Sequence, residues 1–346
     1  MEQPGQLPIA DETEEPAEVT GEKREFEKPD FVKKIEGFDI HNLTPENIEF
    51  MTGVIQNYFL ENFPVRPELV EQLPEHVNII DSDEFARMVE EDEDNRNEGV
   101  PIPKEPSGFY DPEQDKIFIN ISGHRTPGGL FATMFHESLH CVGIENGAGL
   151  AGNFLWPEDY YEDKGIRFDT YNGSNTLKEG TTQLITLGTV VDEMGFDEQA
   201  EMFGYEAEFN IMDAIWRAIP HDEMLDAYFN MGLDDIRIHV DCVFEPEETR
   251  GTIGPTESNE IFAKCLYNLG ITTRKMQEAL ESWGDGGDPD GVMNEVRHAV
   301  GLYMIRRCEM NGMKLPEEWK EPFREYLKPY EGADNNIGNR EEEGDV

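Results

Sequence analysis

Positive charge is scarce in this sequence, which has 28 Lys and Arg residues against 75 Asp and Glu residues and a formal net charge of −47. A surface this acidic repels phosphate backbones and anionic lipid headgroups. We therefore expect neither nucleic acid nor a membrane surface as a partner. The acidity would suit a cationic substrate, but a general acidic bias, as in salt-adapted proteins, explains it more simply.

Long apolar runs are also absent, since no segment approaches the roughly 18 consecutive apolar residues of a membrane-spanning helix. The first residues are acidic and contain proline, and no basic segment followed by an apolar core precedes them, so we expect no signal peptide. Cysteine is rare and forms no C-x-x-C pair, which is typical of reduced core thiols. Together these features predict a soluble cytoplasmic protein, with export by a route that needs no signal peptide left open. The cysteines are Cys141, Cys242, Cys265 and Cys308.

Large apolar side chains are nearly missing from the two ends of the chain. Residues 1–30 are acidic and contain proline, and residues 330–346 are rich in Gly, Asn and Glu, so we expect two disordered tails. Between them, residues 31–150 show a mixed helix and strand pattern and residues 151–329 a mainly helical one. We find no internal repeat. The chain is thus expected to form two adjoining subdomains between its tails.

One helix predicted near the middle of the chain contains the residues best suited to bind a metal and to catalyse a reaction. Apolar residues recur at three- and four-residue spacing as far as Val142, and Thr126-Pro127 supplies an N-cap and a first helical residue. This helix contains the pattern H-E-x-x-H at residues 136–140. Residues four apart lie on one helix face, so His136 and His140 can bind a single zinc ion. Glu137 lies roughly 100° further round the helix, within reach of a water molecule. The alternative is a pair of core histidines without metal.

Short strands are predicted before this helix. Residues 76–80 form the first strand, followed by a helix that starts at 82 and ends in the acidic run 90–94. Residues 108–110 and 116–121 form a hairpin that leads into the H-E-x-x-H helix. A strand beside this helix would let an extended peptide lie along it by main-chain pairing.

A third zinc ligand is needed because catalytic zinc usually takes three protein ligands. No third histidine follows at the spacing H-E-x-x-H-x-x-G-x-x-H. After a long loop at 144–174, Glu179 lies in the first turn of a helix that runs to about 194, and it is the best placed carboxylate. Further helices are expected at about 198–219, 222–230, 232–240, 257–269, 273–283 and 291–311.

The order of these elements resembles the gluzincin branch of zinc metallopeptidases over about residues 75–195. The residues that carry the resemblance are His136-Glu137-x-x-His140 and the downstream Leu177-Lys178-Glu179-Gly180-Thr181-Thr182. The resemblance implies an α+β fold with a zincin-like core, made of a small mixed sheet, an edge hairpin and the H-E-x-x-H helix, followed by a mainly helical C-terminal half. It also implies that His136, His140 and Glu179 bind Zn²⁺ and that Glu137 is the general base.

One position departs from the family pattern, and the residue for one further role is not fixed by it. Some gluzincins have an aspartate four residues after the ligand glutamate, where this chain has Gln183, so Gln183 or Thr182 would have to orient a ligand histidine. The family also uses a downstream Tyr or His to stabilise the oxyanion, and Tyr205 is our candidate. The competing residues are Tyr160, Tyr161, Tyr171 and His221.

The leading hypothesis is a zinc-dependent peptidase that hydrolyses peptide bonds with a metal-activated water. Two alternatives stay open: a non-catalytic binding or regulatory protein on the same scaffold, and a metal-dependent amidase with a non-peptide substrate. The expected partner is a peptide or protein substrate. The sequence does not indicate which substrate is cut or what the oligomeric state is.

Overall fold

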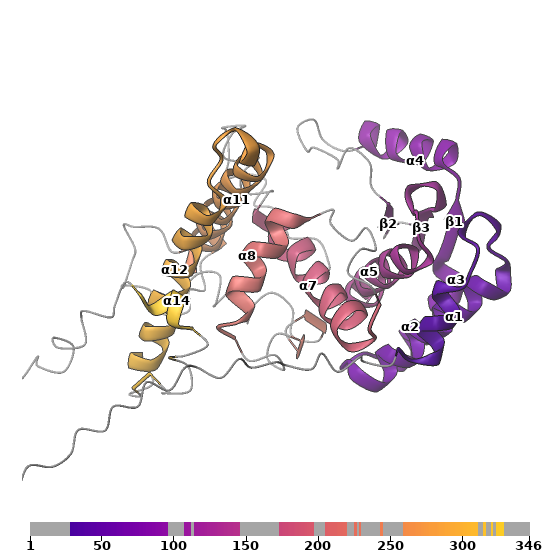
Figure 1. The fold of residues 1–346 in the computed structure, drawn as a ribbon, viewed down its shortest axis with the longest axis horizontal. Helices are drawn as coiled ribbons and strands as arrows, with labels where there is room; N and C mark the ends of the chain where they lie inside the picture. Colours follow the sequence, from indigo (N-terminus) through magenta and orange to yellow (C-terminus); the bar gives the residue numbers. More distant parts are fainter. Residues whose placement is uncertain are drawn as a thin grey trace, which may run out of the picture.

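The computed structural model describes part of the chain, and that part is mostly helical with one small mixed sheet, which places it in the α+β class. In Figure 1 the N-terminal helices and strands gather at one end and the C-terminal helices, in orange and yellow, at the other. Residues 1–27, residues 330–346 and most of the loop predicted at 144–174 lie outside the described residues. The described residues are 28–95, 107–111, 114–145, 173–196, 205–219, 225–226, 228–229, 243–244, 259–310, 314–315, 320 and 323–328.

Three helices open the described chain: α1 (Asp30–Glu36), α2 (Pro45–Asn62) and α3 (Pro67–His76). Helix α2 begins at a capping box, in which the side chain of Thr44 accepts a hydrogen bond from the main-chain N–H of Asn47. Single turns of 3-10 helix elsewhere in the described chain are η1 (Ile40–Asn42), η2 (Ile121–Gly123) and η6 (Trp283–Asp285).

Helix α3 was not expected, and it changes the position of His76. We predicted His76 as the first residue of a strand, but it is the last residue of α3. Pro74 lies inside this helix and has no N–H to donate to the carbonyl of Val70. The side-chain amide of Gln56 donates to that carbonyl instead, at 2.8 Å. A contact from α2 therefore replaces the hydrogen bond that proline removes.

The sheet contains β1 (Val77–Ile80), β2 (Gly108–Asp111) and β3 (Lys116–Asn120) in the order β1-β3-β2. Strand β3 is central and pairs in parallel with β1 and antiparallel with β2, which confirms the predicted hairpin. Ile117 and Ile119 on β3 are fully buried. Strand β2 is consequently an edge strand of the sheet.

Helix α4 (Ser82–Asn95) follows β1, and here the sequence interpretation was wrong about the end. We expected the acidic run 90–94 to end the helix in a loop, but the helix continues to Asn95. Glutamate is a good helix former and the run contains neither glycine nor proline, so nothing in it breaks the helix.

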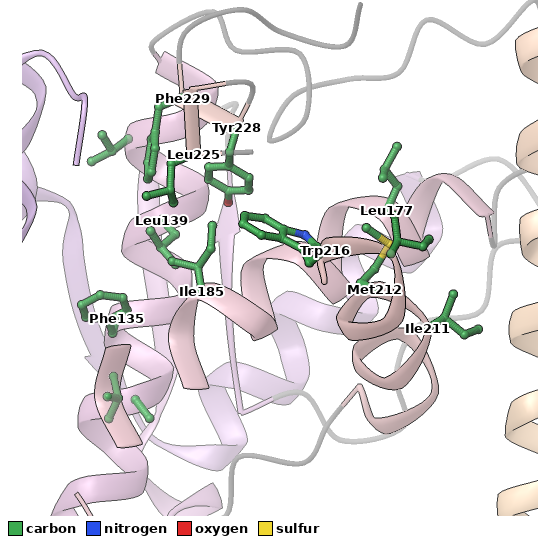
Figure 2. Packing of buried hydrophobic residues seen from close by; sticks show 14 of the residues in the cluster. Phe135, Leu139, Leu177, Ile185, Ile211, Met212, Trp216, Leu225, Tyr228 and Phe229 are labelled. Atoms are coloured by element: carbon green, nitrogen blue, oxygen red, sulfur yellow. The ribbon is translucent and has the colours of Figure 1, made fainter. Parts of the chain in front are cut away.

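Helix α5 (Pro127–Glu145) packs against the sheet and carries H-E-x-x-H. The Thr126 hydroxyl accepts a hydrogen bond from the N–H of Gly129 at 3.1 Å, as expected of an N-cap. Its buried side chains meet those of the C-terminal half in one continuous core, part of which Figure 2 shows with Phe135 and Leu139 of α5 near Ile185.

The C-terminal half begins with a single helical run of mixed type. It comprises the π-helical segment η3 (Thr176–Gly180), α7 (Thr181–Leu187) and the π-helical segment η4 (Gly188–Glu193). The later helices are α8 (Glu206–Trp216), α11 (Asn259–Glu281), α12 (Pro289–Met310) and α14 (Arg324–Leu327). Helix α12 confirms the prediction at 291–311. The helices predicted at 222–230 and 232–240 lie largely outside the described residues.

Helix α11 corrects the prediction of two helices with a break near Gly270, because it is continuous. A Cβ atom on Gly173 would lie 1.9 Å from the carbonyl oxygen of Leu266 and 3.0 Å from the nitrogen of Gly270. The chain at Gly173 therefore packs directly on the backbone of α11 beside Gly270. Gly270 thus lies at a close approach of two segments and does not end the helix.

Cys141, Cys265 and Cys308 are buried and form no disulfide, in agreement with the predicted core thiols, while Cys242 lies outside the described residues. Within the described ranges, no helix combines the length and apolar character that a bilayer crossing requires.

Candidate metal centre

Helix α5 places His136 and His140 one turn apart on one face, where their rings lie edge to face and their Nε2 atoms are 3.2 Å apart. Both side chains are buried, with 6% and 3% of their surface exposed. A separation of 3.2 Å fits either one hydrogen bond between two neutral imidazoles or two ligands of a single ion, so the group that faces both nitrogens is informative.

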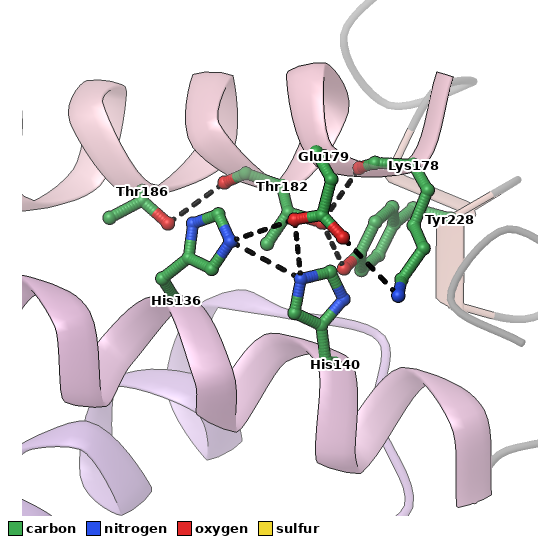
Figure 3. A network of polar contacts seen from close by, with 7 residues as sticks. All are labelled: His136, His140, Lys178, Glu179, Thr182, Thr186 and Tyr228. Carbon is green, nitrogen blue, oxygen red and sulfur yellow. Dashed lines mark hydrogen bonds and ion pairs between the residues drawn. The ribbon is translucent and has the colours of Figure 1, made fainter. Parts of the chain in front are cut away.

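Glu179 supplies that group from the helical run across the site. Its Oε2 atom lies 3.3 Å from Nε2 of His136 and 3.2 Å from Nε2 of His140 (Figure 3). In a tetrahedral zinc site with bonds of about 2.1 Å, neighbouring donor atoms are about 3.4 Å apart. The three side chains named from the sequence thus converge with nearly the spacing that a zinc ion requires.

The position of Glu179 depends on close packing of η3 against α8. A Cβ atom on Gly180 would lie 2.6 Å from the carbonyl oxygen of Glu208, so only glycine permits this contact. At the other end of η3, the hydroxyls of Thr176 and Thr273 are 2.7 Å apart, which ties the segment to α11. A π-helical turn next to a functional site is common, because it shifts side chains out of the regular helical register.

Charges around the three residues favour the forms that bind metal. Burial lowers the pKa of His140 to about 4, so its imidazole is neutral at pH 7. Burial opposes ionisation of Glu179, but the adjacent Lys178 and hydrogen bonds with both histidines outweigh burial and hold the pKa of this carboxyl well below its usual value. Lys178 Nζ lies 3.2 Å from Oε1, the oxygen that does not face the histidines. Neutral imidazole and ionised carboxylate are the forms that coordinate zinc.

Glu137 is buried beside this group and does not belong to it. Burial raises its pKa to about 7, Glu179 adds to the rise, and His136, Lys178 and a main-chain hydrogen bond from Tyr110 oppose it. Tyr110 faces Ile117 across the pairing of β2 with β3. Since its N–H reaches Glu137, it points away from β3. The side of β2 that does not pair with β3 therefore faces the carboxyl of Glu137.

Comparisons with protein-family models, curated proteins and solved structures found no match. Which metal these three residues could hold is therefore judged from the donor set alone. Two imidazoles and one carboxylate suit zinc and related transition metals, whereas Mg²⁺ and Ca²⁺ prefer oxygen ligands throughout. The described residues thus fit a zinc ion that has three protein ligands and one open position.

The expected orientation of a ligand histidine by Thr182 or Gln183 is not found. The Nδ1 atoms of His136 and His140 have no hydrogen-bond partner in the described part of the chain. Thr182 donates its hydroxyl proton to the carbonyl of Lys178 at 2.9 Å instead, as threonines inside helices often do.

Tyr205 lies next to the centre, as the sequence proposed. It is the N-cap residue of α8, and its ring is stacked on that of His136 with centroids 5.9 Å apart and an interplanar angle of 7°. The competing residues Tyr160, Tyr161, Tyr171 and His221 lie outside the described residues.

Tyr228 is a further residue near the centre that the sequence did not single out. Its hydroxyl lies 2.8 Å from Thr182 Oγ1, and because the proton of Thr182 is already donated to Lys178, Tyr228 is the donor (Figure 3). Burial raises its pKa, and the charges of Glu179 and Glu137 raise it further, so the phenol remains neutral. No motif surrounds Tyr228, and only its three-dimensional position reveals it.

Proposed function

We propose that this protein is a zinc-dependent peptidase with a gluzincin-like core. One observation carries the proposal: Nε2 of His136, Nε2 of His140 and Oε2 of Glu179 lie within 3.2–3.3 Å of one another, from two helices that are far apart in sequence. The predicted first turn of a downstream helix supplies the carboxylate, as in the family that the sequence resembles. The acidic chain acts, on this proposal, as a soluble cytoplasmic enzyme.

Zinc in such a centre supplies Lewis-acid activation of water and of the scissile carbonyl. Glu137 accepts a proton from the attacking water and passes it to the leaving amine. In the metal-free protein burial raises the pKa of Glu137 to about 7. A bound zinc ion would lower this pKa and so favour the ionised carboxylate that accepts the proton. Tyr205 donates a hydrogen bond to the oxyanion from its place beside His136.

The edge strand favours a peptide over a smaller amide as substrate. Among the described strands, β2 pairs with β3 on one side only, and its other side faces Glu137. An extended peptide that pairs with this open edge brings its own main-chain carbonyls to the base without needing a particular side chain. A small non-peptide amide has no chain to pair with β2, so the geometry gives it no comparable support.

The test separates metal binding from turnover. Zinc content of the purified protein is measured by elemental analysis, and cleavage of a random peptide library is followed by mass spectrometry. Glu137→Gln should retain zinc and lose turnover, because the amide cannot accept the proton. Asp213→Asn, which makes the same chemical change in the ion pair with Arg217 on α8, should keep both.

Two results would contradict the proposal. If the wild-type protein contains no zinc after purification in a zinc-containing buffer, the proposed metal centre does not exist. Zinc-loaded wild type that cleaves no peptide, with Glu137→Gln indistinguishable from it, supports the non-catalytic alternative instead.

A further inference from the structure

A second group of side chains that could hold a metal ion lies at the turn of the hairpin. It consists of His76 at the end of α3, Asp115 in the turn before β3, and Cys141 on α5, and one donor atom from each lies within 4.8 Å of the others. His76 and Cys141 are buried, whereas the side chain of Asp115 is 38% exposed. No spacing along the chain links these residues, because they come from three separate elements.

The imidazole of His76 is held by one residue through two oxygens. Its Nδ1 atom lies 2.7 Å from the main-chain carbonyl oxygen of Asp115 and 3.0 Å from the carboxylate oxygen Oδ1. Because a carbonyl oxygen only accepts, Nδ1 carries the proton, and Nε2 is the nitrogen that can bind an ion. Asp115 has a φ of 53°, and within the described ranges it is the one non-glycine residue in the left-handed region. This conformation is unfavourable for most side chains, and here it turns both oxygens toward the same ring.

Tyr110 fixes the carboxylate from the other side, since its hydroxyl donates to Oδ1 of Asp115 at 2.9 Å. The side chain of Asp115 is therefore positioned by a partner that would remain if a cation joined the group. Outer hydrogen bonds of this kind orient the ligands of metal sites.

We propose that His76, Asp115 and Cys141 bind a second zinc ion, with water as the fourth ligand. A thiolate, an imidazole and a carboxylate are the three ligand types that zinc accepts, and a thiolate selects zinc over Mg²⁺ and Ca²⁺. Donor atoms of a tetrahedral zinc site lie roughly 3.3–3.8 Å apart, so side chains within 4.8 Å need to move by about 1 Å. The exposed carboxylate of Asp115 gives the ion a path from solvent.

This site would fasten the hairpin to α3 and α5. Cys141 follows His140 directly, but successive helical residues point about 100° apart, so the two sites lie on different sides of α5. Tyr110 contacts both sites, through its hydroxyl to Asp115 and its N–H to Glu137. The inference does not depend on peptidase activity, and it fails or stands independently of it.

Cobalt distinguishes the two sites, because only the second contains sulfur. Metal-free full-length protein is titrated with Co²⁺, and the near-ultraviolet charge-transfer band of a thiolate bound to Co²⁺ is recorded. We expect two equivalents of bound cobalt and a thiolate band. Cys141→Ser should lose the band and one equivalent, whereas His136→Ala should lose one equivalent and keep the band. Cys308→Ser, which removes another buried thiol on α12, is the matched control and should keep both.

Asp115→Asn tests the carboxylate without disturbing the turn, since asparagine also tolerates the left-handed conformation. We expect cobalt binding at the band-forming site to weaken by at least tenfold. A wild-type protein without the band, a band that survives in Cys141→Ser, or unchanged affinity in Asp115→Asn would each overturn the proposal. The first of these results does not require that any variant folds.

Discussion

The two helical walls of the candidate metal centre are built differently. Helix α5 is one regular helix whose side chains are almost all buried, and it presents His136 and His140 on a single face. The opposite wall changes from π-helix in η3 to α-helix in α7 and back to π-helix in η4, and it contributes Glu179 alone.

The second wall is also more polar. Its interior holds a series of threonines, and two of them satisfy their hydroxyls on the same helix: Thr182 donates to the carbonyl of Lys178 at 2.9 Å, and Thr186 to the carbonyl of Thr182 at 2.8 Å. Helix α5 is thus placed by local spacing and apolar burial. The Glu179 wall depends on α8 and α11, which lie far along the chain.

Removing a ligand from either wall should have the largest effect. We expect His140→Ala and Glu179→Ala each to weaken zinc binding by more than the roughly 100-fold that loss of an outer-sphere partner costs, because each deletes one of three protein ligands. Competition with a chelator of known zinc affinity measures this. Glu179→Ala with wild-type affinity would mean that only α5 binds the metal.

Gly180 tests whether the second wall depends on its packing. Gly180→Ala places a Cβ atom 2.6 Å from the carbonyl oxygen of Glu208, and we expect it to lower the free energy of unfolding by about 1–3 kcal/mol. Gly188→Ala in the same helical run meets nothing within 4 Å and should raise it by about 0.4–1 kcal/mol. Urea unfolding measures both changes.

The same pair of variants reports on the metal. Displacement of η3 from α8 moves Glu179 but leaves the histidines on α5 in place, so zinc affinity should fall in Gly180→Ala and stay unchanged in Gly188→Ala. If both glycine variants bind zinc equally well, the position of Glu179 does not depend on this contact.

This difference between the walls explains what could be predicted from the sequence. The start of α5, its apolar face and the convergence of His136 with His140 follow from spacing within one helix, which is local information. The hairpin and the cap of α2 at Thr44 are local too. Glu179 was selected because its position in the chain matches a family pattern, and the structure brings it to the histidines.

Features that depend on distant contacts could not be predicted. The π-helical turns, the role of Gly180 and the hydrogen bond of Tyr228 arise from the packing of α8 and neighbouring segments on the second wall. For the same reason Gly270 was misread as a break in α11. Helix α3 was not predicted because Pro74 lies inside it, and the contact of Gln56 with the carbonyl of Val70 is visible only in the structure. Periodicity along one segment contains no information about such partners.

A smaller effect is expected from the polar contact between Tyr228 and the second wall. Tyr228→Phe removes the donor to Thr182 Oγ1 and should lower the free energy of unfolding of the metal-free protein by about 1 kcal/mol. A double-mutant cycle with Thr182→Val isolates the contact itself. Additive losses in the double variant would show that the two hydroxyls do not interact.

The smallest effect concerns Glu208, the buried carboxyl of α8 behind Gly180. Burial raises its pKa, so the folded protein holds this proton more tightly than the unfolded chain does. Its contribution to stability is therefore present below the ordinary glutamate pKa and is lost as the pH rises through the raised value. Glu208→Gln is neutral at every pH, and its amide oxygen can still accept the 2.9 Å hydrogen bond from Gln277.

We expect Glu208→Gln to be more stable than wild type at pH 7.5, with the difference shrinking as the pH is lowered toward 5. Urea unfolding at several pH values measures it. Glu206→Gln removes an exposed carboxylate from the same helix and controls for the loss of one negative charge from a very acidic protein. If the difference in unfolding free energy from wild type is constant with pH, or equal in the two variants, burial of Glu208 makes no pH-dependent contribution to the stability of the protein.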